Sequence, residues 1–91
     1  MKAIKLIVSG LVQGVFFRKF TQEKAVSLSL IGQVKNLPNG SVEIIAKGEE
    51  GSLLHLEKWC ESGSPMSRVN HVVKIEIDPT AVSGTDFKIA Y

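Results

Sequence analysis

The chain has 91 residues, 44% of them hydrophobic, and a formal net charge of +2. This length is sufficient for one compact domain and no more, so we expect a single domain over residues 1–91. So small a positive charge does not indicate nucleic-acid binding, although it is compatible with a small anionic ligand. Cys60 is the only cysteine, which excludes an internal disulfide. With no stretch long enough to cross a membrane, this favours a cytoplasmic protein.

The chain opens with a strand followed by a helix. Residues 2–9 alternate between two faces, one of them wholly apolar, as in a half-buried strand. Apolar residues then recur at helical spacing from about Phe17 to Leu30. We interpret Phe17 and Phe20 as core residues that anchor the start of this helix.

A hairpin comes next. Residues 32–37 form a short strand that ends at Pro38-Asn39-Gly40, and Asn-Gly is a strong turn signal. The return strand covers residues 41–47. This interpretation places Asn36 at the end of a strand, just before the turn.

The second half repeats the pattern. Ser52 could cap a helix that Gly63 terminates, and residues 69–77 form the clearest strand of the chain. A loop over residues 79–85 leads to a closing edge strand over residues 87–91. The expected helix carries one apolar stripe, made of Leu53, Leu56 and Cys60.

The resulting order is β-α-β-β-α-β with a short fifth strand. Two interleaved βαβ halves of this kind form an α+β, ferredoxin-like sandwich, in which two helices cover one face of an antiparallel sheet. This fold hosts enzymes, RNA-binding modules and metal carriers alike, so the function has to be argued from particular residues.

The segment between the first strand and the first helix has the features of an anion site. It contains Gly10 and Gly14, which tolerate the dihedral angles needed to aim backbone N–H groups at one point. Arg18 and Lys19 occupy the first helical turn, where cations are unfavourable, and no acid precedes Glu23. A bound anion would remove this conflict. The alternative is a solvated basic pair beside an ordinary glycine turn, and spacing alone leaves both open.

Other chemistries find little support in the sequence. The loop lacks the GxxxxGK[ST] and GxGxxG phosphate motifs and has no nucleophilic side chain. His55, His71 and Cys60 lack the spacing of metal ligands, so we expect no metal. The expected middle strands carry no aromatic residues on which RNA bases could stack, so we expect no nucleic-acid partner.

Two motifs resemble the signatures of the acylphosphatase family. The first is Gly10-x-Val12-Gln13-Gly14-Val15-x-Phe17-Arg18, and the second is Gly32-x-Val34-Lys35-Asn36-x-x-x-Gly40-x-Val42. The ending Phe87-x-Ile89-x-Tyr91 is also similar to the family's. One departure is Gln33, where the family usually has an aromatic residue.

The resemblance implies an enzyme that hydrolyses the carboxyl-phosphate bond of acyl phosphates without metal or cofactor. It implies that Asn36 orients the attacking water and that substrate phosphate oxygens accept its proton. It also implies a phosphate-binding segment comprising Gln13, Gly14, Val15, Phe16, Phe17 and Arg18.

The residues themselves point the same way. Arginine matches a phosphate bidentately, and the Asn36 amide can both donate to and accept from a water. No general acid is apparent, which restricts the substrate to a phosphate whose leaving group is a weak base, such as a carboxylate. A non-catalytic anion-binding module of a larger carbamoyl-transfer protein is the alternative; the presence of both Arg18 and Asn36 favours catalysis. We expect a monomer with a small-molecule substrate, competing phosphate or sulfate, and no membrane partner.

Overall fold

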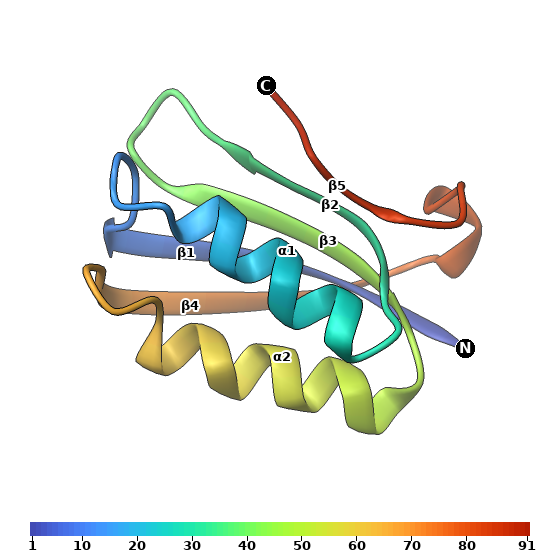
Figure 1. Ribbon diagram of the computed structural model, residues 1–91. Coiled ribbons are helices and arrows are strands. Elements are labelled where there is room, and N and C mark those ends of the chain that lie inside the picture. Colours follow the sequence, from blue (N-terminus) through green and yellow to red (C-terminus); the bar gives the residue numbers. More distant parts are fainter.

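Two helices cover one face of a five-stranded sheet, as Figure 1 shows for the computed structural model, which describes residues 1–91. In chain order the elements are β1 (Lys2–Leu11), α1 (Phe17–Ser27), β2 (Ile31–Asn36), β3 (Val42–Gly48), α2 (Glu50–Ser62), β4 (Arg68–Ile77), a 3-10 turn η1 (Pro79–Ala81) and β5 (Phe87–Ile89). The expected α+β, ferredoxin-like order is confirmed.

The strand order in the sheet is β4-β1-β3-β2-β5. The first four strands are antiparallel to their neighbours, but β5 pairs with β2 in parallel, so the sheet is mixed and not purely antiparallel as expected. The reason lies in the connection after β4. It leaves β4 at the end of the sheet where β2 begins (Figure 1), so β5 must run alongside β2 in the same direction.

The register of the sheet brings the ends of β1 and β2 to one side of the molecule. Val8 of β1 and Asn36 of β2 are both paired with Val42 of β3, which lies between them. The β1–α1 loop and the β2–β3 turn therefore lie at the same end of the sheet, as Figure 1 shows. This juxtaposition positions the candidate site.

The core lies between the sheet and the two helices. Strands β1 and β3 place alternate residues on the helix-covered face, and those positions are buried because they meet the apolar stripes of α1 and α2. The Phe17 ring packs against Trp59 with centroids 5.5 Å apart, joining the two helices. The largest fully buried side chains include Leu6, Val8, Phe17, Val34, Val42, Ile44 and Leu56.

The expectation that Phe20 is a core residue is wrong, because its side chain is 37% exposed. The buried positions of α1 are Phe17, Thr21 and Ala25, spaced four apart. Phe20 precedes Thr21 by one residue and is therefore rotated by about 100° away from this stripe. Phe17 alone anchors the helix start.

Both helices have boundaries that differ from the expected ones. Strand β3 continues to Gly48, so a single residue, Glu49, connects it to α2, and Ser52 lies inside the helix instead of capping it. Helix α1 ends at Ser27 and not at Leu30, because Ser29 adopts a left-handed conformation with φ 59°. The single-residue connection before α2 and the turn at Ser29 therefore set these helix boundaries, which helix propensity alone does not define.

Candidate active site

A bulge and a glycine lie in β1 just before the strand ends at Leu11. The pairing of β1 with β4 shifts register between Ser9 and Gly10, and Gly10 has φ 126°. A Cβ atom at this position would collide with the carbonyl oxygen of Arg68. Only glycine fits both the dihedral angle and the close backbone approach, so this residue is required for the path that the loop takes.

The start of α1 leaves several backbone donors free. Phe16 is the N-cap residue, and no side chain caps the helix. The first intrahelical bond joins the Phe20 N–H to the Phe16 carbonyl at 3.1 Å. The N–H groups of the three residues after Phe16 therefore have no intrahelical acceptor, and no acid lies in the first turn. These donors and the helix dipole favour an anion.

The loop before the helix holds two residues in left-handed conformations. Gly14 has φ 76° and Phe16 has φ 62°. The Phe16 side chain is 68% exposed, so burial of the ring does not compensate for this conformation. A non-glycine residue held in this region costs on the order of 1 kcal/mol or more, and such strain is concentrated at functional sites.

Arg18 is half-buried and belongs to none of the three ion pairs in the structure. Its guanidinium lies over the ring of Tyr91, 5.1 Å from the centroid, a distance suited to a cation–π interaction. Sequence reasoning missed this contact. The ending Phe87-x-Ile89-x-Tyr91 was a signal, but nothing in it indicated which residue the ring would meet.

Asn36 is the last residue of β2 and is half-buried. It is aligned with Val42 and lies two residues after Val34, and both of these valines are buried under the helices. Its side chain thus belongs to the helix-covered face, beside the β1–α1 loop. Its Oδ1 atom is buried without a hydrogen-bond partner. A buried acceptor of this kind is costly unless a water or ligand donates to it.

The Gln13 side chain is used inside the protein. Its Nε2 atom donates to the carbonyl oxygens of Leu37 and Ser41, each at 2.8 Å. The amide therefore joins the loop to the β2–β3 turn, a role that sequence reasoning missed. Any contact of Gln13 with a phosphate would fall to its backbone N–H.

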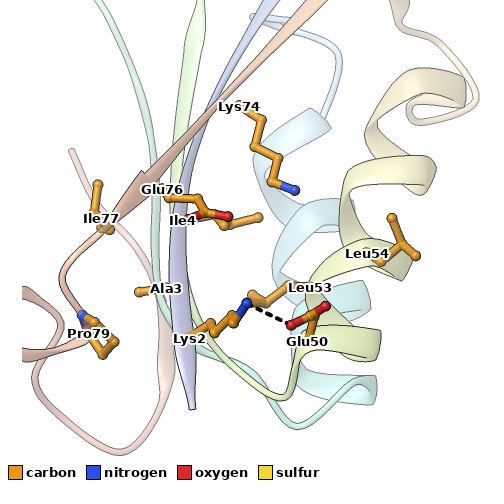
Figure 2. A pocket seen from close by; sticks show the side chains of 10 residues that line it. All are labelled: Lys2, Ala3, Ile4, Glu50, Leu53, Leu54, Lys74, Glu76, Ile77 and Pro79. Carbon is orange, nitrogen blue, oxygen red and sulfur yellow. Dashed lines mark ion pairs between the residues drawn. The ribbon is translucent and has the colours of Figure 1, made fainter.

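A cavity of about 300 Å³ lies at the opposite end of the sheet. It is formed by the start of β1, the start of α2 and the end of β4, and the Lys2–Glu50 ion pair at 2.8 Å lies beside it (Figure 2). This pair raises the pKa of Lys2 and lowers that of Glu50. None of the predicted site residues lines this cavity, so we separate it from the candidate site.

The remaining reactive side chains do not converge. No three His, Cys, Asp or Glu residues are grouped so that they could hold a metal ion. Cys60 is buried in α2, and burial raises the pKa of its thiol to about 12. No helix combines the length and the apolar character that crossing a membrane requires.

The topology and the loop together define a small ferredoxin-like α+β protein in which an uncapped helix start carries an arginine in its first turn. A more specific identification comes from the sequence match. The chain belongs to the acylphosphatase family, because the family's sequence model matches residues 4–89. Members of this family hydrolyse acyl phosphates, so the chain is an acyl phosphate hydrolase.

Similar proteins support this membership. The acylphosphatase of Rubrobacter xylanophilus is 42% identical over 88 residues, which cover 97% of this chain and 79% of that protein. The crystal structure of acylphosphatase from Bacillus subtilis is 39% identical, covers 100% of both chains and superimposes with a TM-score of 0.92. Full-length HypF, solved in a phosphate- and nucleotide-bound form, contains a similar segment: 25% identical, with a TM-score of 0.85, spanning 12% of that chain.

Proposed function

We propose that this chain hydrolyses acyl phosphates at the β1–α1 loop, with the substrate phosphoryl group bound by the segment from Gln13 to Arg18. The backbone N–H groups of Gln13, Gly14, Val15, Phe16 and Phe17 would surround the phosphate, and Arg18 would bind it through its fork of donors. The observation that carries this proposal is the uncapped helix start next to an arginine that has no acidic partner.

Asn36 then places the attacking water. Its buried Oδ1 atom, which has no partner within the protein, would accept a hydrogen bond from a water lying beside the phosphate. The water oxygen attacks phosphorus, the bond from phosphorus to the acyl oxygen breaks, and a carboxylate leaves. A phosphate oxygen of the substrate takes the proton of the water. The carboxylate is a weak base, so no general acid is needed, and positioning with charge stabilisation is sufficient.

The chemistry of the site limits its substrates and competitors. An alkyl phosphate ester would leave as a strongly basic alkoxide, and no side chain at the loop could protonate it. Inorganic phosphate and sulfate have the geometry of the bound group, and we infer that they compete with the substrate. We further infer a monomeric, cytoplasmic enzyme that needs neither metal nor cofactor.

The test is steady-state hydrolysis of benzoyl phosphate, with an alkyl phosphate ester as the comparison. We expect turnover of the first, little of the second, and no loss after exhaustive chelation. Loss on chelation that added metal restores would contradict a metal-independent mechanism.

The alternative to hydrolysis at this loop is anion binding without catalysis, by a module of the kind that could also form part of a longer chain; a segment of the much longer HypF, solved in a phosphate- and nucleotide-bound form, has the same fold. Such a module would bind phosphate yet leave benzoyl phosphate intact. The same assay, run beside a phosphate titration, therefore separates the two functions.

A further inference from the structure

We propose that the Gln13 carboxamide is a positioning residue, which holds the phosphate-binding loop against the β2–β3 turn and thereby sets its distance from Asn36. This inference rests on the proposed function, since it assigns the phosphate to the loop and the water to Asn36. It adds a connection between the two groups, and that connection is a specific pair of hydrogen bonds.

The geometry uses both hydrogens of one amide nitrogen. Gln13 Nε2 lies 2.8 Å from the Leu37 carbonyl oxygen and 2.8 Å from the Ser41 carbonyl oxygen. These two acceptors flank the turn over residues 38–40, so the Gln13 amide bridges the two ends of the turn. An NH₂ group has two donors, and both are satisfied here. Both N–H donors of the Gln13 side chain are therefore used within the protein.

The turn that receives these bonds is itself tightly held. The Leu37 N–H donates to the Ser41 carbonyl at 2.8 Å, and the Gly40 N–H donates to the Leu37 carbonyl at 3.1 Å. The Ser41 N–H donates to Asn39 Oδ1 at 3.0 Å. Because the Leu37 and Ser41 carbonyls are held by the hydrogen bonds of the turn, they cannot move with the loop unless the turn breaks. They therefore fix the position of the loop relative to the turn.

The two hydrogen bonds from Gln13 end close to Asn36, the residue proposed to orient the water. Leu37 directly follows Asn36, and Ser41 directly precedes Val42, which is aligned with Asn36 across the sheet. Among the hydrogen bonds of the structure, the two from Gln13 are the only ones that join residues 12–16 to residues 37–41. Without them, only sheet pairing through β3 and the packing of Val12 and Phe17 in the core would connect the loop to Asn36.

This arrangement divides binding from catalysis. The groups proposed to hold the phosphate are contiguous, from Gln13 to Arg18, so they can stay together when the loop shifts as a unit. Asn36 comes from a different strand. Loss of the two Gln13 hydrogen bonds should therefore misalign the water while leaving the phosphate bound. A displacement of reacting groups by about 1 Å can cost on the order of 10²-fold in rate.

The test variant is Gln13→Met. Methionine has a similar length and no donor, and it adds no charge beside an anion site. The Leu37 and Ser41 carbonyls each keep a backbone hydrogen bond, so the variant should fold. We expect the kcat for benzoyl phosphate to fall roughly ten- to a hundredfold, while the inhibition constant for inorganic phosphate changes far less.

A matched control exists in α1. Gln22 is half-buried, and its Nε2 atom donates to the Phe87 carbonyl at 3.0 Å, so it makes the same kind of bond away from the loop. Gln22→Met should lower the melting temperature by a comparable amount and leave kcat unchanged. This comparison separates a general loss of stability from a loss of alignment.

A double variant tests whether Gln13 acts through Asn36. If it does, Gln13→Met should cost much less in kcat when Asn36 is already alanine, because there is no longer a water-orienting group to misalign. Full multiplicativity of the two effects would overturn the proposal. So would wild-type kcat in Gln13→Met, or a loss of phosphate affinity equal to the loss of kcat, which would make Gln13 a phosphate ligand. Failure of the proposed function gives a different result: an inactive wild-type enzyme, or active Arg18 and Asn36 variants.

Discussion

Arg18 is a half-buried cation at a helix start, where the dipole disfavours it and no carboxylate offsets its charge. This arrangement is unfavourable in the free protein and becomes favourable when an anion binds. The planar guanidinium can present two parallel donors to a phosphate, and lysine cannot. Shape as well as charge should therefore matter at this position.

We expect Arg18→Lys to lower kcat/KM for benzoyl phosphate at least tenfold, since a charge-assisted hydrogen bond is worth about 1.5–3 kcal/mol. Arg68→Lys is the control, because Arg68 is exposed and is the only other arginine. Circular dichroism should show that both variants are folded. Turnover close to wild type in folded Arg18→Lys would remove this residue from the proposed mechanism.

Asn36→Ala should lower kcat by roughly 10²–10³, the effect of losing one preorganised group at a reaction centre. Phosphate inhibition should change much less, because Arg18 and the loop amides remain. Asn70→Ala, on an exposed position of β4, provides the control. A large drop in melting temperature with kcat preserved would instead assign Asn36 to stabilising the end of β2.

Strand β5 brings the end of the chain to the site, although it has only three residues. It pairs with β2, and Tyr91 beyond it lies under the Arg18 guanidinium. A cation–π contact at an exposed site is worth about 0.5–1 kcal/mol. The ring should thus restrict the orientation of Arg18 more than it stabilises the fold.

Removal of the ring should have a modest kinetic effect. We expect Tyr91→Leu to lower kcat/KM by about two- to fivefold, the equivalent of that energy. Tyr91→Phe keeps the ring and should retain wild-type kinetics. Equal losses in both variants would show that the hydroxyl group matters and the ring does not.

Helix α2 keeps its thiol out of reach. Burial raises the pKa of Cys60 to about 12, so the reactive thiolate is scarce in the folded protein. We expect iodoacetamide at pH 8 to modify Cys60 only as fast as the protein unfolds, and to do so readily in denaturant. Mass spectrometry measures the extent of modification. Rapid modification of the native protein would contradict the burial of this residue.

The same shift makes stability depend on pH. Above the ordinary thiol pKa of about 8.5, the unfolded chain loses a proton that the folded chain retains. The free energy of unfolding should therefore decrease as the pH rises from about 8.5 towards 12, with its full value below that range.

For the molecule as a whole, a ligand that binds only the folded state must stabilise it. Phosphate at one hundred times its dissociation constant would add about 2.7 kcal/mol. For a domain of this size, that corresponds to a rise of roughly 10 °C or more in melting temperature. We expect this rise with phosphate or sulfate, compared with chloride at equal ionic strength, and a much smaller one in Arg18→Lys.

The location of binding provides the second readout. Amide chemical shifts during the phosphate titration should change over residues 13–18 and leave α2 undisturbed. Shifts confined to the cavity at the other end of the sheet, near Lys2 and Glu50, would place the anion site there instead.

The sequence alone determined the order of the elements and the location of the loop. Alternation in residues 2–9 and the Asn-Gly turn are local signals, because they depend only on period-two side-chain geometry and on turn dihedrals. The stripe of Leu53, Leu56 and Cys60 is local in the same sense and is buried as expected. The two signature motifs went further and indicated the family, which the whole-chain match confirmed.

Only the tertiary structure decided which distant groups meet. The parallel pairing of β5 and the contact of Tyr91 with Arg18 depend on how segments distant in the sequence pack, and no local pattern encodes them. The acceptors of Gln13 lie 24 and 28 residues further along the chain. A side-chain amide can bond equally well to water, a ligand or a backbone carbonyl, so its partner is chosen by the fold that brings the β2–β3 turn within 2.8 Å of it.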